Sequence, residues 1–585
     1  MLVSQRLLWA LLLLSSAALH AETIVPPGPV SGTWTQSGSP YLIQGEITIL
    51  ADSTLIIQPG VAVIFQGHYK FIINGYLEAL GTETDSILFT AADTTIGWHG
   101  IRFIDAPDSS RLLFCIIQYG KALGSYPDPD ANGGGIYCDH SNPVISCCNI
   151  SWNQAEAGGG GLYCHDSCPL IVDCAIGDNL GWPGGILCEE SSPSIVDCII
   201  SGNRYTGIYC EYGSNAIISR CTVSHNEDYG IRCFFSSPTI DSCVISDNWE
   251  FVGGGIHCDS LSNPIISNSI IRGNTGGSGD ANGGIVCRHN SNPLISHCTI
   301  ADNTGYPAAG GVNSLSGSRP TLSYCLITGN LGSVGAIIYE SSSGANIDHC
   351  TISGNSGFVG AGIYCWDDSG TVISNTIVEG NTGNGGIRFL SSVNPSVRYC
   401  DVNNNENGNL VGEIPPGLGE ITITNLNGDS CDAFFNIFLD PLFVDPTIGD
   451  YHLQSTSPCI DAGDPNSPRD PDSTIADIGA FYFHQSGIGE NRPDHSIPTS
   501  FRLYQNYPNP FNSSTTITLS VPMTSYVSLG VYDIIGRHVA TLINNQLSPG
   551  IHRITFDGSD LPSGTYFLKM ETQGVTEVRK AILLK

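Results

Sequence analysis

The sequence predicts an all-β protein in which a long coil of short parallel strands is followed by a small β-sandwich. Three observations support this fold class. A motif of glycines, a cysteine, a proline, a second cysteine and an asparagine recurs along most of the chain. Within the motif, apolar and polar residues alternate with a period of two. After Phe483 the motif gives way to longer alternating segments separated by turns.

Residues 1–21 have the composition of a secretory signal peptide. They carry Arg6, then an apolar run, then small residues that end at Ala21, which predicts cleavage between Ala21 and Glu22. A retained membrane anchor is the alternative, but the apolar run of residues 7–14 is too short to span a bilayer. No other stretch approaches that length, so we expect no integral membrane segment in the mature chain.

The repeat is defined by two positions that lie five residues apart. The first position is usually a cysteine, and the second is an asparagine in every unit except the first. The first position is occupied by Cys115, Cys148, Cys174, Cys198, Cys221, Cys243, Ser269, Cys298, Cys325, Cys350, Thr376 and Cys400. A second ladder precedes it by ten or eleven residues and includes Cys138, Cys164, Cys188, Cys210, Cys233, Cys258, Cys287, Ser314 and Cys365.

Each unit of about 25 residues holds three short strands and no helix. In the segment GIYC, Ile136 and Cys138 share one face, and Tyr137 points to the other. Parallel strands cannot be joined by tight hairpins, whereas a coil stacks each strand about 4.8 Å from its counterparts above and below. We therefore expect three parallel sheets in about thirteen coils between residues 45 and 400.

The coil explains the cysteines and the asparagines. A secreted chain with 22 cysteines would normally be interpreted as a disulfide framework. Here the ladders accept serine and threonine and give neighbours parallel side-chain directions, which favours buried free thiols packed as small apolar residues. Cys147, Cys168, Cys431 and Cys459 lie off the ladders and are the better candidates for disulfides. The asparagine amides are expected to hydrogen-bond along their ladder where the chain turns.

On these residues the repeat resembles the right-handed parallel β-helix family, which includes pectate lyases and many secreted surface proteins. The opening segment TLIIQPGVAVIFQG and the closing segment DPLFVDPTIGDYHLQSTSPCIDAGDP are similar to the same family. The resemblance implies N-terminal capping coils at residues 22–100, β-helix repeats at 101–405 and a C-terminal cap at 406–484. It implies little about activity, because one fold serves many functions.

After a polar linker at residues 485–498, the segment 499–585 has the length and alternation of a small β-sandwich. Its motifs YPNPF, YDIIGR and LPSGTYFLKM resemble the immunoglobulin-like C-terminal sorting domain of type IX secretion cargo. The resemblance implies that the type IX secretion machinery is a partner, and that the protein is secreted or held at the outer-membrane surface. An immunoglobulin-like module without a sorting role is the alternative.

The charge of the chain excludes one class of partner. The formal net charge is −32, from 54 acidic and 22 basic residues, and no lysine occurs between Lys121 and Lys569. Nucleic-acid binding depends on contacts from Lys and Arg to phosphate, so we expect no nucleic acid among the partners. A polyanionic ligand would also be repelled unless cations bridged the two surfaces.

Two classes of function fit this sequence. The first is a surface protein that acts by binding or as structure, with a polysaccharide or another cell-surface polymer as its partner. The second is a polysaccharide lyase or glycoside hydrolase that acts in a groove beside the loops. The candidate substrate-binding residues are aromatic or acidic loop residues: Trp182, Tyr205, Tyr229, Trp249 and Glu250. The same residues are consistent with loop tips that merely cover the coils.

The sequence assigns no catalytic residue. The NTD, GHG and RIK elements of polygalacturonases are missing, as is the RxPxxR element of one group of pectate lyases. Asp139 and His140 show a faint similarity to a lyase element, but they fall in a turn. Candidates for an arginine base, among which the sequence does not choose, are Arg204, Arg232, Arg272, Arg288 and Arg388.

Calcium is the candidate cofactor. In DPNSPRDPDSTIAD at residues 464–477, the carboxylates of Asp470, Asp472 and Asp477 recur at spacings that hard-cation loops use. A polar turn without a metal accounts for the same residues. Zinc is less expected, because no CxxC pair occurs and the cysteines follow the coil period.

Overall fold

The computed structural model of the protein describes residues 22–485, except 125–127, 251–253, 278–282, 340–342, 367–369 and 391–394. It also describes residues 501–583, except 505, 507–508, 510, 512, 534–536, 548–549, 560, 563 and 573–574. The chain forms two compact units, one up to His484 and one from Gln485. The helices of the described residues are three 3₁₀ turns, η3 (Gln36–Gly38), η4 (Pro129–Ala131) and η5 (Pro446–Ile448).

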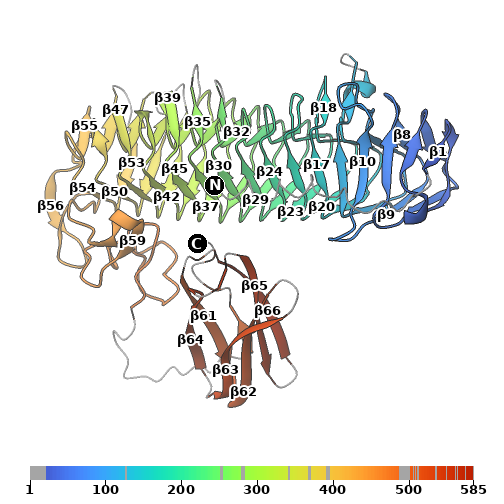
Figure 1. Cartoon of the computed structure of the whole chain (residues 1–585). Coiled ribbons are helices and arrows are strands. Elements are labelled where there is room, and N and C mark those ends of the chain that lie inside the picture. The colour runs from blue at the N-terminus through green and yellow to red at the C-terminus, as the bar shows by residue number, and fades with distance from the viewer. Residues whose placement is uncertain are drawn as a thin grey trace. The chain divides into compact units, whose positions relative to one another are not determined.

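Three long parallel sheets form the first unit (Figure 1). Sheet 1 has sixteen strands, from β1 (Thr23–Val25) to β54 (Asp401–Asn403). Sheet 2 also has sixteen, from β2 (Gly28–Pro29) to β55 (Leu410–Gly412). Sheet 3 has fifteen, from β3 (Gly32–Trp34) to β53 (Ser396–Arg398).

A single coil visits each sheet once. After β17 (Asn149–Ser151) in sheet 1, the chain passes to β19 (Leu162–His165) in sheet 2 and β20 (Leu170–Val172) in sheet 3. It returns to sheet 1 at β21 (Ala175–Gly177). The register stacks equal repeat positions on one another, so that Cys164 lies over its equivalent in the preceding coil. The predicted parallel β-helix is confirmed.

The number of coils agrees with the expectation for residues 45–400. Of the sixteen strands of sheet 1, only β1, β4 (Tyr41–Ile43) and β54 lie outside these limits, so thirteen strands lie within them. The sheets continue at both ends because the flanking residues carry the same alternation of buried and exposed positions.

The inward positions of the three sheets fill one continuous apolar core. Ile136 and Cys138 of sheet 2, Ile145 of sheet 3 and Ile150 of sheet 1 are fully buried, and the following coils repeat the pattern. Because each coil contributes few core residues, its stability depends on contacts with the coils on either side.

From Asp105 onward each coil turns three corners, and most of these corners have one residue in the left-handed conformation. Trp152 (φ 60°) precedes the asparagine ladder, Cys147 (φ 52°) precedes the first cysteine ladder, and His140 (φ 47°) follows sheet 2. Aspartates occupy all three places in the next coil. Left-handed backbone favours Gly, Asn and Asp, which explains why these residue types so often precede the ladder positions.

The asparagine ladder satisfies the backbone at the corner after sheet 1. Oδ1 of Asn179 accepts the backbone N–H of Asn153 at 3.0 Å. Nδ2 of Asn179 donates to Oδ1 of Asn203 at 3.0 Å and to the carbonyl oxygen of Ile150 at 2.9 Å. The same pattern continues to Asn405, with every ladder amide buried. The predicted hydrogen-bonded ladder is confirmed.

The corner between sheets 2 and 3 carries a serine ladder that was not predicted. Oγ of Ser141 accepts the backbone N–H of Ala106 at 2.8 Å and donates to the carbonyl of Asp139 at 2.8 Å. The ladder comprises Ser141, Ser167, Ser191, Ser214, Ser236, Ser262, Ser291 and Ser318, all buried. The serine ladder could have been predicted from the sequence, since these serines mostly stand two positions before the recurring proline.

Three cysteines of the first ladder, Cys148, Cys174 and Cys198, make the same kind of corner contact, which corrects the expectation that they act only as small apolar residues. The thiol of Cys174 accepts the backbone N–H of Cys148 at 3.5 Å and lies 3.2 Å from the carbonyl oxygen of Val172. Ser269 does this with a hydroxyl, whose oxygen accepts the N–H of Cys243 at 3.1 Å. Serine and threonine replace cysteine here because all three side chains can accept a hydrogen bond from the backbone N–H at the corner.

All 22 cysteines are free in the structure. Cys168 is exposed, and Cys147 is partly buried at its corner. Cys431 and Cys459 are buried in the closing segment, where the Cys459 thiol lies 3.3 Å from Oδ2 of Asp401. The four off-ladder cysteines therefore do not form the disulfides for which they were the better candidates.

The closing segment packs along the outer side of sheet 1. It contains two antiparallel pairs, β56 (Ile421–Thr424) with β57 (Ser430–Asp432) and β58 (Phe443–Asp445) with β59 (Asp450–Leu453). Phe443 and Tyr451 share an apolar cluster with Leu326 and Ile377 of sheet 1. The Tyr451 hydroxyl lies 2.8 Å from Oγ1 of Thr328. The segment thus covers part of the side of the coil.

The second unit contains two antiparallel sheets. One has the order β60 (Arg502–Leu503), β61 (Ser514–Val521) and β64 (Gly550–Asp557). The other has the order β63 (His538–Leu547), β62 (Ser525–Asp533), β65 (Gly564–Thr572) and β66 (Val575–Leu583). Leu519 of the first sheet and Leu529 and Leu568 of the second are buried in one core, as the predicted β-sandwich requires.

The thiol contacts predict a rank order of stability at Cys174. Cys174→Ser keeps an acceptor for the N–H of Cys148, whereas Cys174→Ala leaves that buried amide without its partner, at a cost of about 1–3 kcal/mol. We therefore expect the serine variant to unfold at a higher urea concentration than the alanine variant. If the thiol were only an apolar filler, burying a hydroxyl would be the more costly change and the order would be reversed.

Asp401 predicts a pH dependence of stability. Burial raises the pKa of its carboxyl to about 8, above the value of about 4 in an unfolded chain. The folded state therefore holds a proton that the unfolded state releases between these values. The contribution of Asp401 to stability is highest below pH of about 4, falls by up to about 1.4 kcal/mol per pH unit, and levels off above pH of about 8.

Asp401→Asn removes this ionisation, so the loss of stability between pH 5 and pH 8 should become smaller in urea unfolding experiments. Asp52→Asn, at an exposed turn, is the matched control and should keep the wild-type slope. An unchanged slope in the Asp401 variant would show that this carboxyl is ionised in the folded protein.

Candidate functional site

The outer face of sheet 2 carries two ladders of large side chains. The strands concerned are β15 (Ile136–Asp139), β19, β22 (Ile186–Glu189), β25 (Ile208–Glu211), β28 (Ile231–Phe234) and β32 (Ile256–Asp259). Because alternate residues face opposite sides of a sheet, the second and fourth residues of each strand point outward. The second residues are Tyr137, Tyr163, Leu187, Tyr209, Arg232 and His257, and the fourth are Asp139, His165, Glu189, Glu211, Phe234 and Asp259.

Aromatic rings surround the guanidinium of Arg232. Its Cζ lies 4.9 Å from the ring centroid of Tyr209, 5.6 Å from that of Trp182 and 5.9 Å from that of Tyr229. These distances are within the range of cation–π attraction. Tyr209 comes from the neighbouring strand, and the other two rings come from the segments before β22 and β28. Two of the predicted binding residues, Trp182 and Tyr229, thus meet at one arginine, and we call these four residues the Arg232 cluster.

The Arg232 cluster is packed on one side and open on the other. Tyr209 and Tyr229 are buried, Arg232 is partly buried, and 53% of Trp182 is exposed. The imidazole of His257 stacks on the ring of Tyr229 at 4.6 Å. A half-exposed indole beside a guanidinium offers a ligand both a flat apolar surface and hydrogen-bond donors.

Two titratable groups next to the cluster have displaced pKa values. Burial raises the pKa of Glu211 to about 7, against the opposing effects of the Tyr209 hydroxyl and the Arg232 charge. Burial, followed by the Arg232 charge, lowers the pKa of His257 to about 3, so this imidazole is neutral at pH 7. Glu211 is therefore partly protonated at neutral pH, which is the state that a general acid requires.

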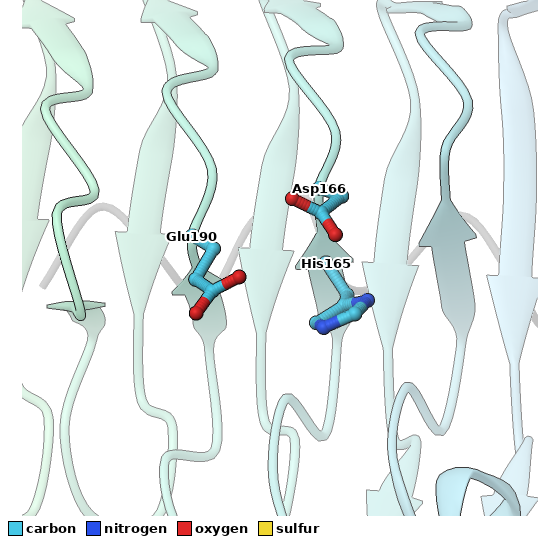
Figure 2. A group of neighbouring side chains, drawn as sticks. All are labelled: His165, Asp166 and Glu190. Carbon is cyan, nitrogen blue, oxygen red and sulfur yellow. The ribbon is translucent and has the colours of Figure 1, made fainter.

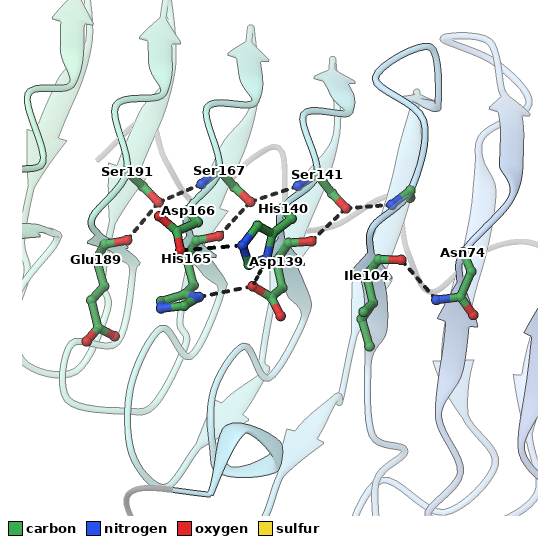
Figure 3. A network of polar contacts seen from close by, with 11 residues as sticks. Asn74, Ile104, Asp139, His140, Ser141, His165, Asp166, Ser167, Glu189 and Ser191 are labelled. Carbon is green, nitrogen blue, oxygen red and sulfur yellow. Dashed lines mark hydrogen bonds and ion pairs between the residues drawn. The ribbon is translucent and has the colours of Figure 1, made fainter. Parts of the chain in front are cut away.

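A second polar cluster lies on the same face at β15 and β19 (Figure 3). Oδ1 of Asp139 accepts hydrogen bonds from Nδ1 of His140 at 2.9 Å and from Nδ1 of His165 at 3.0 Å. Nε2 of His140 lies 3.6 Å from Oδ2 of Asp166. Burial opposes protonation of His165, but the hydrogen bond and charge of Asp139 raise its pKa overall. Asp139 and His140 thus take part in a network that the turn assignment alone did not suggest.

His165 also belongs to a group that offers ligands to a metal ion (Figure 2). One ligand atom each from His165, Asp166 and Glu190 lies within 4.8 Å of the others. His165 and Asp166 stand at the end of β19 and in the turn after it, and Glu190 stands in the equivalent turn of the next coil. Among the described residues, this is the only group of three His, Cys, Asp or Glu side chains whose ligand atoms lie this close together.

The aspartates predicted to bind calcium accept hydrogen bonds within their own part of the chain in the structure, mostly from backbone N–H groups. Oδ2 of Asp470 accepts the N–H of Asp477 at 2.9 Å. The two carboxylate oxygens of Asp477 accept the N–H groups of Asp461 at 2.7 Å and Phe483 at 2.6 Å. Oδ1 of Asp472 accepts from a threonine of the same turn. These bonds are those of a polar turn, and calcium binding at this place stays a prediction.

The described ring and cation contacts do not join the remaining predicted binding residues to the Arg232 cluster. The guanidinium of Arg204 lies 5.8 Å from the ring centroid of Tyr205. Trp249, 56% exposed, belongs to β31 (Trp249–Glu250), the first strand of a six-stranded sheet that the loops build up to β51 (Thr382–Gly383). The backbone of Glu250 continues β31, but its side chain lies outside what the structure describes. Their role in binding stays a prediction.

A shallow pocket of about 340 Å³ lies beside the asparagine corner. Its lining includes Lys121, Trp152, Asp178 and Arg204. Trp152 is half exposed and was not among the predicted residues, because a single tryptophan before a ladder asparagine carries no repeat signal.

Several residues of the outer face could have been found from the sequence. Glu211 and His165 directly follow inward cysteines, and alternation places such residues on the outer side. Arg232 was one of five arginine candidates, and the structure distinguishes it by its three aromatic neighbours.

The predicted signal peptide lies outside the described residues, which begin at Glu22, so cleavage after Ala21 stays a prediction. None of the described helices has both the length and the apolar character needed to cross a membrane.

Comparison with known proteins identifies both units. Residues 134–283 and 283–425 match the model of the right handed beta helix region, and residues 505–584 match the secretion system C-terminal sorting domain. Protein bark beetle of Drosophila melanogaster is 35% identical over 81 residues, which are 12% of this chain. The match spans only 3% of the length of that relative.

Solved structures to which the chain shows a distant similarity include pectate lyase Pel9A, with 11% identity and a TM-score of 0.34 over 64% of this chain and 97% of that one. A mutant of the periplasmic alginate epimerase AlgG has 10% identity and a TM-score of 0.28 over 56% and 76% of the two chains.

The two family matches agree with the three parallel sheets and with the terminal sandwich described above. A sorting domain of this kind directs its cargo to the cell surface or to the medium. The chain is therefore a secreted right-handed parallel β-helix protein that ends in a type IX secretion sorting domain.

Proposed function

We propose that this secreted protein binds a carbohydrate polymer along the outer face of sheet 2. The Arg232 cluster carries the proposal. It places a half-exposed indole and a partly buried guanidinium side by side on the flank of a rigid coil. A sugar ring can lie on the indole while its hydroxyl groups accept hydrogen bonds from the guanidinium.

The regular spacing of the coils favours a polymer over a small ligand. Successive strands of sheet 2 present equivalent outward positions about 4.8 Å apart. A chain of repeating sugars lying along the sheet would meet the partly exposed side chains of Glu189, Glu211 and Phe234 in turn. The net charge of −32 favours a neutral polymer, since a polyanion would meet general repulsion away from Arg232.

A second function, cleavage of the bound polymer, is favoured by one specific observation. Glu211 lies on the strand next to Arg232, and burial holds its pKa near 7. A carboxyl in this state can donate a proton to a leaving oxygen, and the arginine beside it can stabilise negative charge. We keep this as the alternative, because the carboxylate next to Glu211, that of Glu189 on the adjacent strand, accepts a hydrogen bond from the Tyr163 hydroxyl. A paired mechanism needs a second carboxylate placed to attack the sugar or to activate water.

Retention on immobilised polysaccharides tests the binding proposal. The panel should include neutral glucans, xylan and mannan together with polygalacturonate and alginate. We expect Trp182→Ala to weaken binding of the retained polymer at least tenfold, which corresponds to about 1.4 kcal/mol. Trp152→Ala is the matched control, because this tryptophan is similarly exposed but stands at a different corner. Equal binding by wild type and Trp182→Ala, or no retention of the wild type on any polymer, contradicts the proposal.

The cleavage alternative is tested by assaying the same mixtures for unsaturated and reducing-end products. If cleavage occurs, Glu211→Gln should abolish product formation while retention of the polymer persists. In wild type, the rate should rise as pH falls through about 7, where Glu211 gains its proton. Products formed equally by Glu211→Gln would exclude this residue as the acid, and a wild type that forms no products would leave binding as the function.

A further inference from the structure

The polar cluster at β15, β19 and β22 has the features of a metal-binding site. His165 offers an imidazole nitrogen, and Asp166 and Glu190 each offer a carboxylate oxygen, with all three atoms within 4.8 Å of one another. Figure 2 shows the three side chains on two adjacent coils, with His165 and Asp166 on one and Glu190 on the next. Three protein ligands on an exposed surface leave further coordination positions open to water or another ligand.

A neighbouring carboxylate fixes the state of the imidazole. Nδ1 of His165 lies 3.0 Å from Oδ1 of Asp139, and because a carboxylate oxygen only accepts, the Nδ1 atom carries the hydrogen. In the neutral ring the lone pair is then on Nε2, which is free to bind a cation. Metal-bound histidines usually donate their second nitrogen to a carboxylate in this way. Figure 3 shows Asp139 between the two imidazoles of His140 and His165.

The charge around the site is not neutralised by basic residues. Asp139, Asp166, Glu189 and Glu190 lie on three successive coils, and within the described residues no Lys or Arg forms an ion pair with any of them. The ion pairs found there involve only the two histidines. A divalent cation would compensate this accumulated negative charge, and the 3.6 Å contact of Asp166 with His140 would give way to it.

We propose that His165, Asp166 and Glu190 bind a divalent transition-metal ion, with Asp139 orienting the imidazole. The mixed imidazole and carboxylate set favours zinc or a similar ion over calcium, because calcium takes oxygen ligands and imidazole suits transition metals. This site is separate from the turn of Asp470 and does not depend on polymer binding at Arg232.

The chain provides a matched control five coils further along sheet 2. Nδ1 of His289 lies 2.6 Å from Oδ1 of Asp259, which repeats the histidine–carboxylate hydrogen bond. No second and third ligand accompany His289 among the described residues, because the group that meets the distance criterion does not include it. His289→Gln therefore tests whether a histidine–aspartate pair alone explains any metal binding.

Isothermal titration of Zn²⁺ into the chelator-treated, tag-free full chain tests the proposal. We expect one Zn²⁺ bound at this site, with at least tenfold weaker affinity in His165→Gln and in Glu190→Gln. Asp139→Asn should weaken binding by roughly 10–100-fold through loss of the orienting bond, whereas His289→Gln should leave it unchanged. Urea unfolding of each variant checks that the coil is intact.

Three outcomes would overturn the assignment. One is a wild type that binds no Zn²⁺. Another is a Zn²⁺ affinity that is the same in wild type, His165→Gln and Glu190→Gln. The third is Ca²⁺ bound more tightly than Zn²⁺ with the same dependence on Glu190, which would mean that the imidazole is not a ligand.

Discussion

The hydrogen bonding of backbone groups at the three corners of each coil is the constraint on which the rest of the structure depends. A left-handed residue turns the chain at most of these corners and exposes an amide that no strand partner reaches. A buried amide without a partner costs about 1–3 kcal/mol, and such corners recur in coil after coil. Asparagine, serine and cysteine side chains from the adjacent coil meet this need, as Asn179, Ser167 and Cys174 do.

These ladders restrict the inside of the coil and leave the outside free to vary. The inward positions of sheet 2 are isoleucine and cysteine in coil after coil, whereas the outward position changes from Tyr163 to Leu187, Tyr209, Arg232 and His257. A rigid frame that fixes the direction of every outward side chain can therefore carry a binding surface without changing its own packing. The Arg232 cluster and the His165 group lie on this one face.

The sequence predicts most of the fold and little of the candidate site, for a physical reason. Repeated positions are visible because each coil imposes the same requirement, so the Asn153 ladder and the number of coils could be read from spacing alone. The serine ladder was equally visible but was not recognised. Trp182 and Tyr229 could be proposed as loop aromatics, but their meeting at Arg232 depends on how the loops fold over sheet 2, and no repeat encodes that. Asp470 was proposed from its spacing to other aspartates, but its hydrogen bond to the N–H of Asp477 could not be predicted, because it depends on how the turn folds.

The central claim is that cysteine acts in these corners as a free, hydrogen-bonding thiol that serine or threonine can replace. Titration of thiols in the denatured, unreduced protein tests it most directly. The structure has all 22 cysteines free, and the ladder geometry gives neighbouring thiols parallel directions that a disulfide would have to distort. We predict a count close to 22 thiols per chain. A count near zero would mean that the ladders are oxidised, and that covalent bonds rather than corner hydrogen bonds hold the coils together.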